Sequence, residues 1–116
     1  MDRPPLNEEE REARQQLAYL LRLVLSGYCS YLEAAPQVVY LRSRVGGVAD
    51  FDDDFRAFVG INSETDHLPT WATRHLWAEH AIKALEPEIA RLEARAADLA
   101  RGSCEALLIR FAETNA

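Results

Sequence analysis

Carboxylates gathered in one short stretch are the clearest chemical feature of the sequence. Residues 50–66 hold six acidic side chains and one basic side chain, Arg56, so this acidic segment carries −5 of the chain's net charge of −6. Like charges held together repel one another, so such a segment either spreads its acids over solvent or uses them to bind a cation, a metal or a basic partner. The six acids are Asp50, Asp52, Asp53, Asp54, Glu64 and Asp66.

Three of these acids have the spacing of calcium ligands. Asp50, Asp52 and Asp54 match the first, third and fifth positions of an EF-hand loop. Such a loop needs glycine at its sixth position and a bidentate glutamate at its twelfth, where this chain has Phe55 and Ile61. We therefore exclude an EF-hand and predict no resident metal or other cofactor, while a looser magnesium site of one or two carboxylates is an open alternative.

A loop predicted over residues 62–69 brings a histidine close to two of the acids. Glu64, Asp66 and His67 follow one another closely in it, and a carboxylate beside an imidazole is suited to general acid–base catalysis. One hypothesis is therefore a small metal-assisted hydrolase that uses these three residues. The competing interpretation is a structural turn, in which Ser, Thr and Asp side chains bind nearby backbone groups.

The remaining chemically capable residues give weaker signals. His75 and His80 lie about 140° apart on a helix, which does not suit a shared zinc ion. Cys29 and Cys104 lack metal-binding or redox spacing, so we expect them to be small hydrophobes in a reducing compartment. Trp71 is predicted to be a core or interface anchor. The sequence has no cluster of Lys and Arg, which argues against nucleic acid as a partner.

The elements that position these residues are predicted to be helices. Asn7 and Glu10 form a capping-box pattern, and Ser26 with Gly27 marks the end of this first helix. Ser30 is placed to cap a second helix. Apolar residues at helical spacing give the first helix a buried stripe that consists of Leu17, Leu20, Leu21, Val24 and Tyr28.

The second helix has a competing interpretation. Residues 37–41 are also compatible with a short strand, because Pro36 cannot donate a backbone hydrogen bond within a helix. We predict a helix, since no other segment shows the alternating pattern of a partner strand. Gly46 and Gly47 are expected to end the element.

The second half of the chain is predicted to be helical on both sides of the loop. Phenylalanines at helical spacing predict a third helix, with Asp50 or Asp52 as its cap and Gly60 at its end. Beyond the loop, Thr70 is placed to cap a further helical segment, which Pro87 either kinks or restarts. The buried stripe of this last part is predicted to contain Ile89, Leu92, Ala96 and Leu99.

Length and composition set the class of protein. With 116 residues, 48% of them hydrophobic and 28% charged, the chain fits one ordinary globular domain. We predict an all-α fold, a compact single-domain bundle of four to five helices, with residues 1–6 as a flexible tail. The most apolar stretch, residues 17–25, is far shorter than the ~20 residues of a membrane span, and no signal peptide is visible. We therefore expect no membrane association and a cytoplasmic location.

A stretch of the sequence resembles a family of small bacterial proteins of unknown function. The resemblance rests on FRAFVGINSETDHLP at residues 55–69 and spans roughly residues 28–111, with the Ser-Glu-Thr-Asp-His-Leu-Pro loop as its most specific part. Because that family has no assigned activity, it implies no catalytic residue. In size, acidity and helical content the chain is also similar to the immunity proteins that neutralise bacterial toxins. Further residues that carry the first resemblance are Trp77, Ala84, Leu85, Glu88 and Ile89.

The function expected from the sequence is protein binding. We predict an immunity or antitoxin protein whose acidic surface neutralises a basic toxin, because complementary charge speeds encounter between proteins. The alternatives are the hydrolase described above and a homodimer whose acids only aid solubility. Arg91, Arg95 and Arg101 offer another explanation of the acids, as an intramolecular charge match. The residues predicted to contact the partner are Asp50, Asp52, Asp53, Asp54, Glu64, Asp66, His67 and Trp71.

Overall fold

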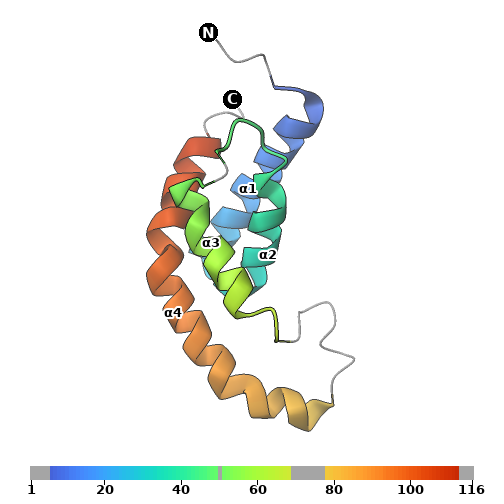
Figure 1. The fold of residues 1–116 in the computed structure, drawn as a ribbon, viewed down its shortest axis with the longest axis vertical. Helices are drawn as coiled ribbons and strands as arrows, with labels where there is room; N and C mark the ends of the chain where they lie inside the picture. Colours follow the sequence, from blue (N-terminus) through green and yellow to red (C-terminus); the bar gives the residue numbers. More distant parts are fainter. Residues whose placement is uncertain (1–5, 50, 69–77, 113–116) are drawn as a thin grey trace.

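The fold is a bundle of helices arranged around one core. The computed structural model describes residues 6–49, 51–68 and 78–112, and it has no strand among them. The first three helices lie beside the C-terminal part of the last one, whose N-terminal part extends past them (Figure 1). The predicted all-α bundle of four to five helices is therefore confirmed, with four helices in the part of the chain that the structure describes. The helices are α1 (Glu8–Leu25), α2 (Tyr31–Arg42), α3 (Asp53–Glu64) and α4 (Glu79–Ala112).

The predicted helix starts are confirmed at α1 and α3. The Asn7 side chain accepts a hydrogen bond from the Glu10 backbone at 2.7 Å, and the Glu10 carboxylate accepts one from the Asn7 N–H at 3.1 Å. Asp52 caps α3 by accepting a hydrogen bond from the Asp54 N–H at 3.0 Å. These caps satisfy backbone donors that have no partner within the helix.

The start of α2 is capped twice, once from its own sequence and once from α4. The Ser30 hydroxyl accepts a hydrogen bond from the Glu33 N–H at 3.0 Å, as the sequence predicts. The Glu93 carboxylate of α4 accepts two more, from the N–H groups of Tyr31 at 2.9 Å and Leu32 at 3.0 Å. A negative group at a helix N-terminus also interacts favourably with the helix dipole.

The helical prediction for residues 37–41 is confirmed, because α2 runs from Tyr31 to Arg42. Pro36 lies on the exposed side of α2. After the helix, Gly46 and Gly47 both have positive φ, +75° and +73°. Glycine adopts this conformation without the steric cost that a side chain would add.

Three predictions about the second half are wrong. Gly60 does not end α3, which continues to Glu64 because Ile61 is buried in the core and Thr65 closes the helix end by donating its hydroxyl to the Ile61 carbonyl at 2.7 Å. The predicted loop therefore begins later. Leu99 is 56% exposed, and Ala100 takes the buried position beside it.

The last helix is one continuous element. It passes through Pro87 and Gly102 without a break over 34 residues and curves along its length (Figure 1), as long helices commonly do. The predicted cap at Thr70 and the anchor at Trp71 lie outside the described residues, as do Asp50 and most of the predicted tail.

The core lies where the first three helices meet the C-terminal half of α4. The largest fully buried side chains include Phe55 and Phe58 of α3, Leu17 and Leu21 of α1 and Leu107 of α4. Burial of apolar area of this kind is the main favourable contribution to folding. The prediction that Tyr28 belongs to the buried stripe of the first helix is wrong, because α1 ends at Leu25 and Tyr28 is 84% exposed. Within the described ranges, no helix combines the length and the apolar character that a membrane span needs.

A buried arginine joins α1 to the turn that follows α2. The Arg14 guanidinium donates from Nε to the Val45 carbonyl at 2.7 Å and from Nη2 to the Gly46 carbonyl at 2.8 Å. Its carbon Cζ also lies 5.1 Å from the centre of the Phe111 ring of α4. Arg14 thus links three parts of the bundle.

Candidate functional site

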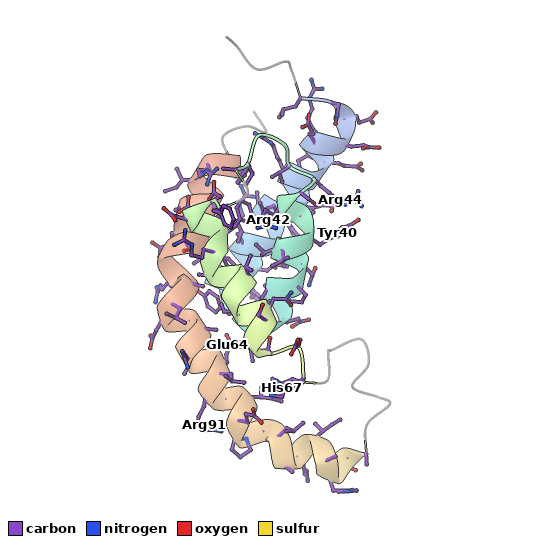
Figure 2. The ribbon with its side chains drawn as sticks, in the orientation of Figure 1. Tyr40, Arg42, Arg44, Glu64, His67 and Arg91 are labelled. Atoms are coloured by element: carbon purple, nitrogen blue, oxygen red, sulfur yellow. The ribbon has the colours of Figure 1, made fainter. Side chains whose placement is uncertain are left out.

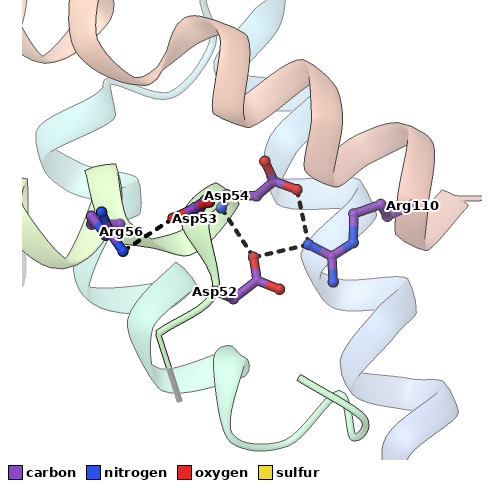
Figure 3. Close-up of polar contacts among 5 residues, drawn as sticks. All are labelled: Asp52, Asp53, Asp54, Arg56 and Arg110. Carbon is purple, nitrogen blue, oxygen red and sulfur yellow. Dashed lines mark hydrogen bonds and ion pairs between the residues drawn. The ribbon is translucent and has the colours of Figure 1, made fainter. Parts of the chain in front are cut away.

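The first acids of the acidic segment are bound to an arginine of the same chain. Arg110 Nη1 of α4 lies 2.9 Å from Asp52 Oδ1 and 2.9 Å from Asp54 Oδ2 (Figure 3). The Asp52 carboxylate is only 15% exposed. The Arg110 hydrogen bond lowers the pKa of Asp52, and Asp52 in turn raises the pKa of Arg110.

This arrangement makes part of the stability depend on acidity. A carboxyl whose folded-state pKa is lowered stabilises the fold above its unfolded pKa, and that contribution is lost as the pH falls through the folded pKa. We expect Arg110→Ala to lower the free energy of unfolding by about 1 kcal/mol at neutral pH. The difference between variant and original should shrink below the ordinary Asp pKa of 3.8. Urea unfolding of both proteins at neutral pH and at a pH below 3.8 measures this difference in the free energy of unfolding.

The matched control for this prediction is Arg56→Ala. Arg56 pairs with Asp53 at 3.0 Å on the open surface, where the two side chains are 69% and 86% exposed, so its removal should change stability little. An Arg110 effect of the same size at acid and neutral pH would contradict the role given to the Asp52 carboxylate.

The rest of the acidic segment is only partly free. Glu64 lies 3.7 Å from Arg95 of α4, which is the intramolecular match that the sequence left open. Arg101 pairs instead with Glu105 of its own helix. Asp66 is exposed, and no ion pair joins it to another described residue. The premise that these acids form one patch open to a cationic partner is therefore wrong for most of the described segment, because arginines of the same chain offset them.

The loop residues proposed for catalysis do not converge. His67 Nε2 lies 3.0 Å from Glu88 Oε1 of α4. Glu64 instead pairs with Arg95, which lies about two helical turns further along α4. Figure 2 shows Glu64 and His67 at the end of α3 beside the part of α4 that carries Arg91. The described part of the chain has no group of three or more His, Cys, Asp or Glu side chains arranged for a metal ion. The loop serves here to tie the end of α3 to α4.

The two cysteines have the environment of inert thiols. Burial raises the pKa of Cys104 to about 12, and its thiol lies 3.7 Å from the Leu21 carbonyl as a weak donor. Burial and the carboxylates of Glu33 and Glu93 raise the pKa of Cys29. Because the thiolate is the nucleophilic form, neither cysteine is placed for nucleophilic catalysis.

An apolar groove between α1 and α2 is the surface feature that the sequence did not predict. Its volume is about 530 Å³, and none of the described residues that line it is charged. Tyr19 and Tyr40 are 63% and 56% exposed, so the groove is open to a large partner. It is lined by Gln16, Tyr19, Leu20 and Leu23 of α1 and by Pro36, Gln37, Tyr40 and Leu41 on the α2 side.

Charges stand at the two ends of this α1–α2 groove. Beyond one end, the Arg44 guanidinium lies over the Tyr40 ring, with Cζ 4.4 Å from the ring centre, and the two side chains neighbour each other in Figure 2. Toward the other end, Glu33 lies one turn before Pro36 on α2. Neither Glu33 nor Arg44 has an ion pair with another described residue. The signal in the sequence was the excess of apolar residues on α1, since Tyr19 and Leu23 lie outside its buried stripe.

Comparison of the chain with protein-family models, curated proteins and solved structures gave no match. The candidate site therefore rests on the geometry of the chain itself.

Proposed function

We propose that the chain is a protein-binding module whose docking surface is the α1–α2 groove. The observation that carries this proposal is an uncharged, apolar groove with two half-exposed tyrosines on a chain with a net charge of −6. Tyrosine is enriched among the residues that dominate protein interfaces, because its ring gives a large contact area and its hydroxyl still bonds to water or partner.

The shape of the groove suits a helix of the partner. Its α1 wall runs from Gln16 to Leu23, which is about 10 Å or two helical turns. An amphipathic helix laid into a hydrophobic groove is a common mode of recognition, with anchors three or four residues apart. Amide side chains at Gln16 and Gln37 offer hydrogen bonds along the rim.

The charges at the groove ends define the chemistry of that helix further. We expect a carboxylate of the partner opposite Arg44 and a cationic side chain opposite Glu33, because interfaces place opposite charges across from each other. The partner segment is therefore an apolar helical face flanked by an acid at one end and a base at the other.

The immunity or antitoxin role stays a prediction within this proposal. The acidic surface open to a toxin is smaller than the sequence predicts, since Asp52 and Asp54 are bound by Arg110. Among the described acids of the segment, a toxin would meet Asp66 and Asp53 most freely, because Asp66 is exposed and Asp53 is 86% exposed even in its pair with Arg56. The groove would supply the apolar contact that excludes water and keeps a bound toxin from dissociating quickly.

The test is capture of the products of adjacent genes on the tagged chain after co-expression. Tyr19→Ser and Tyr40→Ser should each weaken capture at least about tenfold, as expected for an interface anchor. Tyr28→Ser is the matched control, because Tyr28 is 84% exposed but lies outside the groove. Circular dichroism checks that each variant folds.

Two outcomes would count against the proposal. One is that no product is captured, and the other is capture that is indifferent to both groove tyrosines. Capture that is instead lost in an Asp53→Asn, Asp66→Asn variant would return the binding surface to the acidic segment.

A further inference from the structure

We infer that the occupant of the α1–α2 groove is a second copy of this chain, docked about a two-fold axis so that the two α2 helices run antiparallel. This inference rests on the proposed function, because it names the partner of the same groove. It follows from two features of the groove. The residues along each wall are spaced symmetrically, and the charges beyond its two ends are opposite in sign.

The residues that α2 contributes to the groove are spaced symmetrically. In an antiparallel pair of identical helices, each residue faces the one at the mirror position about the midpoint. Placing the axis at the middle of the groove brings Pro36 opposite the second copy's Leu41 and Gln37 opposite its Tyr40. Every groove residue of α2 thus meets another groove residue.

The α1 wall obeys the same symmetry. With the axis perpendicular to the helices and in the plane of contact, α1 faces the second copy's α1 in antiparallel fashion. Gln16 then faces Leu23, and Tyr19 faces Leu20. The same rotation therefore covers both walls at once, so that two antiparallel helices of the second copy cover the groove instead of one helix laid between its walls. The dimer would then bury the rings of Tyr19 and Tyr40 from both copies.

The charges at the groove ends complete the match. In the register that the apolar residues set, Glu33 of one copy lies opposite Arg44 of the other, and the pair occurs twice in the dimer. Arg44 lies two residues beyond the end of α2, but the chain still turns as a helix there, because the Val45 N–H donates to the Leu41 carbonyl at 3.0 Å. Within one copy Glu33 and Arg44 are eleven positions apart, about 16 Å at helical rise, and cannot reach each other. The contact of the Arg44 guanidinium with the Tyr40 ring, with Cζ 4.4 Å from the ring centre, holds the cation at this end of the groove, where its N–H groups can donate to a carboxylate.

The experiment uses charge reversal and sedimentation equilibrium over a wide range of protein concentration. Glu33→Arg and Arg44→Glu each place two pairs of like charges across the axis, so each variant alone should dimerise at least about tenfold more weakly than the original chain. An equimolar mixture of the two variants should restore the dimer, because both pairs are then opposite in sign. Only a contact between copies predicts this rescue.

Two further variants sharpen the result. Glu33→Arg combined with Arg44→Glu in one chain should also dimerise normally. Arg91→Glu makes the same change of charge at an exposed position of α4 that lies far from the groove (Figure 2). This variant should dimerise as strongly as the original chain. Circular dichroism separates loss of association from loss of folding.

The outcomes separate this inference from the proposed function. A chain that is monomeric at every concentration, or single variants whose mixture gives no rescue, overturns the second copy as the occupant. If the groove tyrosine variants still lose capture of an adjacent gene product, the protein-binding proposal survives and the occupant is a different protein. If Tyr19→Ser and Tyr40→Ser leave the dimer as strong as before, the groove is not the contact surface between the two copies.

Discussion

Replacing Arg14 with alanine is expected to lower the free energy of unfolding by about 3 to 4 kcal/mol. The side chain is 9% exposed and donates to the carbonyls of Val45 and Gly46. Its loss would leave the Val45 carbonyl without that donor in a part of the core where Val45 itself is fully buried. The contact between the guanidinium and the Phe111 ring would go with it, which adds to the cost.

Lysine and an exposed arginine provide the controls for Arg14. Arg14→Lys keeps the charge but not the fork of donors, so it should recover only part of the stability. Arg11→Ala, on the exposed side of the same helix, should change the free energy of unfolding by no more than about 0.5 kcal/mol. Urea unfolding followed by circular dichroism measures all three. An Arg14→Ala loss no larger than that of Arg11→Ala would contradict the bridging role.

The second large effect is expected at Glu93. Its carboxylate accepts from the N–H groups of Tyr31 and Leu32 at the start of α2, and hydrogen bonds to a charged group are stronger than neutral ones. We expect Glu93→Ala to lower the free energy of unfolding by about 2 kcal/mol. Glu93→Gln should be nearly as harmful, because its amide group presents only one acceptor oxygen to two donors.

Asp98→Ala is the matched control for Glu93, because Asp98 is an exposed acid on the same helix. It should be close to neutral in the same urea titration. Hydrogen exchange adds a local measurement, since loss of the Glu93 cap should raise exchange at the first turn of α2. Equal losses for Glu93→Ala and Asp98→Ala would show that the cross-helix cap does not contribute.

The parts of the fold that follow from neighbouring residues could be predicted. Asn7, Ser30 and Asp52 cap helices through backbone groups two or three positions away, and such short-range patterns are visible in a sequence. The helix through Pro36 followed from the absence of a partner strand. These elements depend on local chemistry more than on tertiary packing.

Other features depend on groups far apart in the chain. Gly60 looked like a helix end, but burial of Ile61 extends α3 beyond it, because tertiary packing overrides propensity. The Glu93 carboxylate caps α2, which begins more than sixty positions earlier in the chain. Neither partner is visible from spacing alone.

The acidic segment shows the limit of counting charge along the sequence. Its net charge is correct, but Asp52 and Asp54 meet Arg110, which lies more than fifty positions later. Glu64 likewise meets Arg95. The α1–α2 groove was missed for the opposite reason, because the sequence shows which residues are apolar but not which of them the other helices leave uncovered.

Chemical labelling of tyrosine in the free and the associated protein is the most direct test of the groove as the binding face. The chain has four tyrosines, of which Tyr19 and Tyr40 line the groove, Tyr28 is exposed elsewhere and Tyr31 is buried. Mass spectrometry after treatment with a tyrosine-directed reagent gives the reactivity of each one. We predict that association protects Tyr19 and Tyr40 and leaves Tyr28 as reactive as before. Groove tyrosines that stay as reactive as Tyr28 in the associated protein would contradict the account.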